Sequence, residues 1–239
     1  MDPLGAACTF NRACCKPDQA AGNGTVGEWF WFGEQPFLKL NLKGERFCNE
    51  SGPYDYMLHS TIMQPHQTYV DIWDANHAAQ AEAFDEVGCC RLFPFPNGAK
   101  NNIPMQVVDG MIEKLIEDGY VQKADTMEEL AEKLNLPVET TVASWKHYNE
   151  MAAAGEDTDY YKKPVFLTPV KQGPFYALKV GPALLAVCGG LKCNNDFQCL
   201  DENGEVIEGL YVLGNIMGDI TAVDYPINVA GNSHGRCIT

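Results

Sequence analysis

The sequence predicts an α+β fold in which strands, then helices, then strands again follow one another along the chain. Residues 37–42 alternate apolar and polar side chains, residues 105–151 repeat apolar positions at helical spacing, and short strand-like runs return after residue 170. This segregated order is typical of α+β proteins rather than of alternating βαβ units. With 239 residues, 46% of them apolar, the chain can bury a core in each of two lobes, which we place at residues 1–170 and 171–239.

The first lobe begins with strands. Residues 37–47 indicate a hairpin with its turn at residues 43–45, and residues 69–73 indicate a strand that leads into a helix over residues 76–84. The opening thirty residues are rich in Gly, Ala, Cys and Asn and show no clear period, so we expect irregular structure there.

Three helices are predicted in the centre of the chain. The first covers residues 105–116, and the second covers residues 127–134 behind a capping box formed by Thr126 and Glu129. The third follows a proline, runs to residue 151 and stops at a glycine. These helices complete the first lobe.

The second lobe returns to short strands. Residues 175–180, 191–193 and 205–213 have the apolar, β-branched composition of strands and are separated by Asn-Gly and Glu-Gly turns. We therefore expect a sheet-based lobe at the C-terminal end.

The charge balance limits the classes of partner. The chain has 32 acidic and 17 basic residues and a net charge of −15, which repels nucleic acid and anionic lipid surfaces. No apolar run is long enough to span a membrane, and the N-terminus lacks the pattern of a secretory signal. We expect no nucleic acid partner, no membrane partner and a cytoplasmic location.

Ten cysteines could indicate disulfides, a metal site or neither. No two have the C-x-x-C spacing of a metal site, so we expect buried thiols in a reducing compartment and no metal. An iron–sulfur role for Cys188, Cys193 and Cys199 is the weaker alternative. No Gly-x-Gly-x-x-Gly run follows a predicted strand, so the usual cradle for dinucleotide phosphates is not expected.

Two groups of motifs resemble one family. A Gly-Gly-Leu run at residues 189–191, an Asn-Gly turn and the run at residues 207–215 are similar to the closing segment of fumarate reductase, urocanate reductase and ketosteroid dehydrogenase flavoproteins. Residues 44–50 resemble the G-x-R-F-x-N-E motif of the same superfamily, and the resemblance covers residues 37–239 in order. It implies a C-terminal fragment of an FAD-dependent oxidoreductase, with a substrate-capping lobe followed by the last strands of the flavin-binding domain.

The resemblance also implies a cofactor site. The positions that match the family's flavin-contacting segments are Gly189, Gly190, Gly214, Asn215, Gly231, Asn232 and Ser233. A glycine at the end of a strand lets the backbone approach a flat ligand, although it can equally close a tight turn. We expect FAD in the full-length protein and absent or weak FAD binding by this chain.

The ketosteroid dehydrogenases are the better match for the reacting residues. By resemblance, Tyr54 transfers the proton, Tyr225 donates a hydrogen bond to the substrate carbonyl, and His77 is a further candidate acid. Both tyrosines could instead be ordinary half-buried aromatics. The candidate substrate contacts are Arg46, Asn49, Glu50 and Asn228, with an Arg46–Glu50 ion pair at the edge of the lobe as the simpler interpretation of the first and third.

The cations that bind fumarate in fumarate reductases cannot be placed in this sequence. Two unpaired carboxylates would be costly to bury, so fumarate itself is not the expected substrate. We expect a small-molecule enone or unsaturated acid, with the electron donor or acceptor left open. The alternatives are an isolated, non-catalytic substrate-binding domain that cannot hold FAD alone and, less well supported, an electron-transfer module built on the cysteines.

Overall fold

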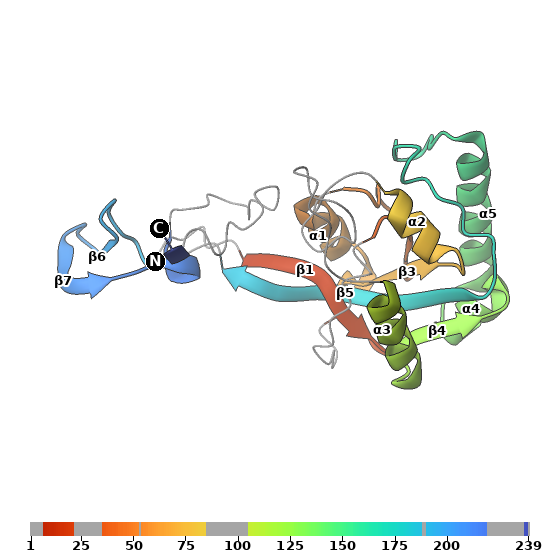
Figure 1. Ribbon diagram of the computed structural model, residues 1–239, viewed down its shortest axis with the longest axis horizontal. Helices are drawn as coiled ribbons and strands as arrows, with labels where there is room; N and C mark the ends of the chain where they lie inside the picture. Colours follow the sequence, from red (N-terminus) through yellow and green to blue (C-terminus); the bar gives the residue numbers. More distant parts are fainter. Residues whose placement is uncertain are drawn as a thin grey trace. The chain divides into compact units, whose positions relative to one another are not determined.

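The structure of the chain is a computed structural model that describes residues 7–21, 35–52, 54–84, 105–187, 190–218 and 237–238 (Figure 1). The predicted α+β class is confirmed by its mixture of strands and helices. The chain divides into two compact units, one of Asn11–Ala183 and one of Met1–Phe10 with Leu184–Thr239. The predicted division into a capping lobe and a flavin-binding part stays a prediction about function.

A five-stranded sheet lies mainly in the larger unit. Its strands are β1 (Ala7–Cys15), β2 (Leu38–Asn41), β3 (Tyr69–Trp73), β4 (Val121–Ala124) and β5 (Phe175–Val187). Their order is β1-β5-β3-β2, and β4 also pairs with β5. The pairs β2–β3, β3–β5 and β4–β5 are antiparallel, so β3 is a central strand.

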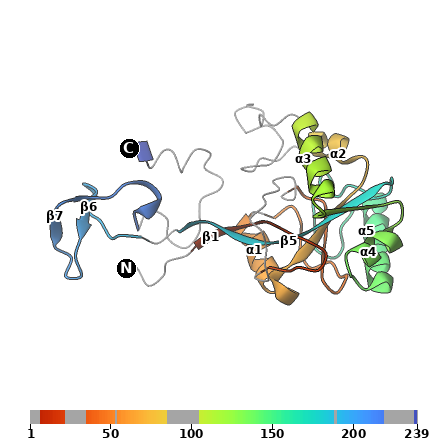
Figure 2. The same ribbon diagram turned by 90° about the horizontal axis from the view of Figure 1, so that it is seen from below.

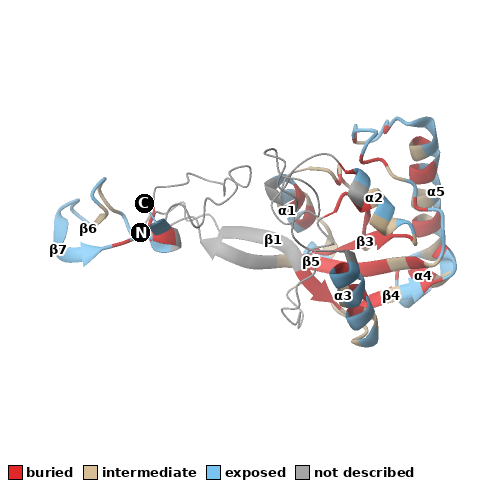
Figure 3. Ribbon diagram, in the orientation of Figure 1, coloured by how far each residue is buried: buried red, intermediate tan, exposed pale blue. Residues whose placement is uncertain are grey.

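Strand β3 separates two hydrophobic clusters because its alternate side chains point to opposite faces of the sheet. Tyr69 and Trp73 belong to the cluster that contains apolar residues of α3 (Met105–Glu117). Val70 and Ile72 belong to the cluster that contains apolar residues of α4 (Met127–Lys133) and α5 (Val138–Ala154). All five residues of β3 are buried, as the red colour of this strand in Figure 3 shows.

Helices α4 (Met127–Lys133) and α5 (Val138–Ala154) lie side by side in both views (Figures 1 and 2). The predicted capping box is present, because the Thr126 hydroxyl accepts a hydrogen bond from the Glu129 amide at 3.2 Å. The shorter helices α1 (Tyr54–Ile62) and α2 (His77–Ala83) follow β2 and β3.

The smaller unit contains a two-stranded hairpin of β6 (Gln198–Leu200) and β7 (Val206–Tyr211). A short helix, η3 (Gly214–Ile216), follows, and Met217 then pairs in parallel with Leu191. All six side chains of β7 are exposed, as the pale blue strand in Figure 3 shows.

Several sequence predictions agree closely with the structure and others do not. The strand at residues 69–73 and the three central helices are confirmed within a few residues. Strands β4 and β6 were not predicted, because each has only three or four residues and no clear alternation. The expectation of irregular structure before residue 30 is wrong for Ala7–Cys15, where pairing with β5 supplies the order that local sequence lacks.

Strand β1 also changes the interpretation of a glycine run. Gly22, Gly24 and Gly27 have the Gly-x-Gly-x-x-Gly spacing, and with β1 present this run does follow a strand. Residues 16–21 separate the two, whereas the dinucleotide fingerprint begins directly at a strand end. Residues 22–34 lie outside the described residues, so we assign no phosphate site there.

Among the helices that the structure describes, none has both the length and the apolar character needed to cross a membrane.

Candidate functional site

Four charged side chains meet in a buried cluster in the larger unit, which we call the Arg46 cluster: Arg46, Glu50, Asp157 and Lys162. Arg46 donates two hydrogen bonds to the Glu50 carboxylate at 2.8 and 2.9 Å and two to Asp157 at 2.7 and 2.6 Å. The Lys162 ammonium lies 3.2 Å from Glu50. The side chains of all four are between 0 and 5% exposed, so the cluster is out of solvent.

Aromatic rings surround these charges. The Arg46 guanidinium lies 5.2 Å from the ring centre of Tyr148 and 5.1 Å from that of Tyr160. Lys162 donates hydrogen bonds to the Tyr148 hydroxyl at 3.0 Å and to the backbone carbonyl of Pro36 at 2.6 Å. Cation–π contacts and charge-assisted hydrogen bonds thus replace the hydration that burial removes.

The cluster keeps its two carboxylates ionised. Burial alone would raise the pKa of Glu50, but Lys162 and Arg46 outweigh burial and hold that pKa below its usual value. The pKa of Asp157 is likewise lowered, because hydrogen bonds from Arg46 and from backbone amides outweigh its burial. Burial opposes the charge on Arg46, yet its bonds to both acids raise its pKa. Burial lowers the pKa of Lys162, against the attraction of Glu50.

The cluster fastens the loop after α5 to the segment that leads into α1. Asp157 accepts hydrogen bonds from the backbone amides of Asp159, Tyr160 and Lys162, which orders this loop. The Tyr160 hydroxyl donates to the carbonyl of Arg46 at 3.1 Å. The side-chain amide of Asn49 donates to the backbone carbonyl of Tyr160, also at 3.1 Å. The structure therefore contains the predicted Arg46–Glu50 ion pair, and the substrate contacts of Arg46, Asn49 and Glu50 stay predictions.

Sequence reasoning missed Asp157 and Lys162. They lie 111 residues or more from Arg46, in a loop with no apolar period, so no local pattern connects them. The sequence offered one signal, the opposite charges of Arg46 and Glu50 in the motif at residues 44–50, and it does not identify their distant partners.

His77 is the first residue of α2 and is 13% exposed at its side chain. One ring nitrogen lies 3.1 Å from the carbonyl of Asp74, and the other lies 3.1 Å from the Asp109 carboxylate. Its ring meets the Tyr176 ring edge-on at 6.1 Å. Both ring nitrogens thus have hydrogen-bond partners within the chain, and the acid role of His77 stays a prediction.

Tyr54 is the first residue of α1, four residues after Glu50, and its side chain lies outside the described residues. Six further predicted site residues also lie outside the described part of the chain, namely Gly189, Tyr225, Asn228, Gly231, Asn232 and Ser233. Asn215 lies in η3, and its side chain is not described.

The two described glycines of the cofactor set are required by contacts within the chain. A Cβ atom on Gly190 would collide with the backbone of Ile216 and Gly218, which lies against it. Gly214 has φ +74°, and a Cβ atom there would lie 2.7 Å from the Cys237 sulfur. Contacts within the chain therefore account for glycine at both positions, and the cofactor role of Gly190 and Gly214 stays a prediction.

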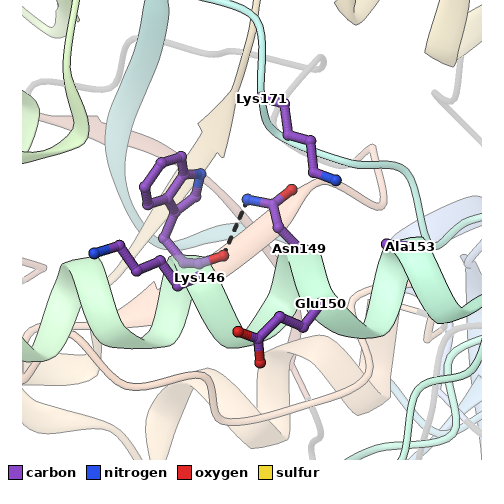
Figure 4. Close-up of a pocket in the computed structure, with 6 residues that line it drawn as sticks. Lys146, Asn149, Glu150, Ala153 and Lys171 are labelled. Atoms are coloured by element: carbon purple, nitrogen blue, oxygen red, sulfur yellow. Dashed lines mark hydrogen bonds between the residues drawn. The ribbon is translucent and has the colours of Figure 1, made fainter.

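A shallow hollow of about 310 Å³ lies along α5 and is lined by Trp145, Lys146, Asn149, Glu150, Ala153 and Lys171 (Figure 4). The side-chain amide of Asn149 donates hydrogen bonds to the backbone carbonyls of Trp145 and Val170 at 3.0 Å each. None of the predicted site residues lines this hollow, so we do not assign the reaction to it. Over the described ranges, no group of three or more His, Cys, Asp or Glu side chains could hold a metal ion.

A comparison with protein families shows which family the chain belongs to. Residues 32–228 match the FAD binding domain family. The chain belongs to this family. Its motif at residues 44–50, and with it Arg46 and Glu50, falls inside the matched region.

The curated relatives of this chain are named as reductases, oxidoreductases or dehydrogenases. It is 32% identical over 206 residues to a vinyl phenol reductase of Lactiplantibacillus plantarum, covering 85% of this chain and 41% of the relative. It is 30% identical to an NADH:acrylate oxidoreductase of Vibrio harveyi, covering 78% of this chain and 16% of the relative. It is also 30% identical to a 3-oxosteroid 1-dehydrogenase of Mycolicibacterium smegmatis, covering 83% and 36%. The chain thus spans well under half the length of these relatives.

Solved structures share the fold. A 3-ketosteroid Δ1-dehydrogenase from Sterolibacterium denitrificans superposes with a TM-score of 0.67 at 22% identity, covering 98% of this chain and 41% of that one. The open conformation of a flavocytochrome c3 fumarate reductase gives a TM-score of 0.64 at 20% identity, covering 98% and 36%. At these identities the likeness establishes the fold alone.

Proposed function

We propose that the protein containing this chain is an FAD-dependent oxidoreductase that reduces or desaturates a carbon–carbon bond conjugated with a carbonyl or similar group. The observation that supports this most strongly is the family match over residues 32–228, combined with identities of 30–32% to enzymes named for vinyl phenol, acrylate and 3-oxosteroids. Vinyl phenol and acrylate each contain a conjugated carbon–carbon double bond, and the third name is that of a dehydrogenase acting on a ketone. When bound, FAD supplies the hydride transfer in either direction.

In this proposal the chain contributes the proton and the substrate orientation. Tyr54 transfers the proton at the carbon that does not exchange hydride, and Tyr225 donates a hydrogen bond to the substrate oxygen as negative charge develops on it. The Arg46 cluster supports this arrangement, because it fixes the backbone of residues 46–50 just before Tyr54. His77 is the alternative acid if Tyr54 does not act.

The missing fumarate-binding cations favour a monoanionic or neutral substrate over a dicarboxylate. Among the described residues, the one arginine near the motif, Arg46, already gives four hydrogen bonds to Glu50 and Asp157. A guanidinium has five N–H donors, so little capacity is left to clamp a substrate carboxylate.

The test is a substrate panel with the intact protein. We would supply reduced methyl viologen as electron donor and compare 4-vinylphenol, acrylate, a conjugated cyclic enone and fumarate. Turnover of at least one of the first three at a higher kcat/KM than fumarate is expected. Preference for fumarate contradicts the substrate class, and failure to retain FAD at all supports the alternative of a non-catalytic domain.

A further inference from the structure

Two cysteines lie directly opposite each other in the unit that contains Leu184–Thr239. Cys193 and Cys199 form an isolated antiparallel bridge. The backbone amide of Asn194 donates to the carbonyl of Gln198 at 3.0 Å, and the backbone amide of Leu200 donates to the carbonyl of Lys192 at 2.9 Å. Because these bonds join the neighbours of the two cysteines, Cys193 and Cys199 are a non-hydrogen-bonded pair.

This pairing gives the two cysteines a backbone geometry that is compatible with a disulfide. Opposite residues in a non-hydrogen-bonded pair have Cα atoms about 4.5 Å apart and side chains on the same face of the ladder. Disulfides have Cα separations of about 4.4–6.8 Å, so the usual separation of such a pair falls within the range that a disulfide can span. Both residues are thiols in the structure, and both belong to one small apolar cluster with Val212 and Met217.

The turn between the cysteines is held by its own hydrogen bonds. The Asn194 side-chain oxygen accepts from the amides of Asp196 and Gln198 at 3.0 Å each. The amide of Phe197 donates to the Asn194 carbonyl at 3.1 Å, and Phe197 itself adopts a positive φ of 62°. The register that places Cys193 opposite Cys199 is therefore specified locally.

We propose that Cys193 and Cys199 are a redox-active pair that forms a reversible cross-strand disulfide when the protein meets a peroxide. Cys199 is 2% exposed, whereas Cys193 is partly exposed. The peroxide therefore reacts first at Cys193, and Cys199 resolves the product from inside the cluster.

The two steps balance. The Cys193 sulfur attacks hydrogen peroxide, the O–O bond breaks, a sulfenic acid forms and one water leaves. The Cys199 sulfur then attacks the Cys193 sulfur, the S–O bond breaks, the S–S bond forms and a second water leaves. Two thiols lose two hydrogens and two electrons in total, and the peroxide is reduced to two waters.

The disulfide would add a covalent link to a segment that backbone hydrogen bonds already join to residues 216–218. The Leu191 amide donates to the Ile216 carbonyl at 2.9 Å, and the Gly218 amide donates to the Leu191 carbonyl at the same distance. Oxidation therefore links β6 covalently to the segment of residues 190–193, in which Leu191 pairs with Met217. The pair itself follows from the ladder geometry and does not depend on the proposed function.

Proteolysis after oxidation tests the pair directly. The chain is treated with hydrogen peroxide, its remaining thiols are alkylated, and it is cleaved after Lys192 and before Asp196 and Asp201. These cuts separate residues 193–195 from residues 196–200 unless a disulfide joins them. We expect one joined species, two hydrogens lighter than the sum of its parts, that separates on reduction. Exposed Cys237 reports that the dose was sufficient. Separate peptides at a dose that oxidises Cys237 overturn the proposal.

Variants test the order of the steps. In Cys199→Ser, a sulfenic acid should accumulate at Cys193 and be captured by dimedone, because no resolving thiol remains. In Cys193→Ser, the buried Cys199 should stay a thiol at the same dose. Cys237→Ser should leave the joined peptide unchanged. Loss of the joined peptide in Cys237→Ser would show that Cys237 takes part in forming the disulfide, and oxidation of Cys199 at the same dose in Cys193→Ser would overturn the proposed order of the steps.

Discussion

Glu50→Gln is the sharpest test of the Arg46 cluster. The substitution keeps the shape of the side chain and removes its negative charge. Two buried cations, Arg46 and Lys162, are then opposed by Asp157 alone. Removing one partner of a buried ion pair costs about 3–5 kcal/mol, because it leaves an uncompensated buried charge. For a chain of this size, that loss lowers the Tm by roughly 6–20 °C.

The matched control is Glu129→Gln on α4. Glu129 forms an i,i+4 pair with Lys133 at 2.8 Å, but both side chains are more than 40% exposed. Solvent already screens this pair, and glutamine can keep the hydrogen bond that Glu129 accepts from the Asp125 amide, so no measurable loss is expected. Urea unfolding followed by far-UV circular dichroism compares the two variants, since α1 to α5 all lie in the unit of Asn11–Ala183.

The pH dependence provides a second readout. Because the folded-state pKa of Glu50 is below its ordinary value, the ionised carboxylate contributes stability above the unfolded pKa of about 4.3. That contribution is lost as the pH falls through the lower folded-state pKa. The stability gap between the wild type and Glu50→Gln should therefore be constant near neutrality and close in acid. A gap no larger than that of Glu129→Gln, or one that persists unchanged in acid, refutes the reasoning.

Three further results are expected. Gly110→Ala should stabilise the protein by about 1 kcal/mol in urea unfolding, because Gly110 lies inside α3 with open space around it, whereas Gly190→Ala should destabilise it by about 1–3 kcal/mol through its collision with the Ile216 backbone. In the intact enzyme, Tyr225→Phe should lower turnover by about 10²- to 10³-fold and Tyr54→Phe should abolish it with little change in KM, as steady-state kinetics would show. Calorimetric titration of this chain with FAD should show weak or no binding, and tight binding contradicts the fragment interpretation.

The sequence predicted the parts of the fold that have a strong local signal. The helix of Val138–Ala154 has apolar periodicity and a terminal glycine, and the strand of Tyr69–Trp73 has a continuous β-rich run. Strand β1 gave no such signal, because its order comes from pairing with β5, more than 150 residues away in sequence. The Arg46–Glu50 pair was predictable, because its members are four residues apart. Asp157 and Lys162 were not predictable, because only folding brings them close to Arg46.

The geometry of the Arg46 cluster also separates its two suggested roles. The Arg46 guanidinium donates four hydrogen bonds to Glu50 and Asp157, and the Arg46 side chain is 5% exposed. These observations favour a positioning role for Arg46 over a substrate contact. Arg46→Lys keeps the charge but cannot bind two carboxylates in this bidentate way.

The kinetics of Arg46→Lys then distinguish these roles, measured well below its unfolding temperature. If Arg46 positions the segment before Tyr54, stability and kcat fall together while KM changes little. If Arg46 binds the substrate, KM rises by the larger factor, and that rise is greatest for an acidic substrate such as acrylate and small for a neutral enone. A KM increase confined to the acidic substrate therefore assigns Arg46 to substrate binding, and equal kcat losses on both substrates assign it to positioning.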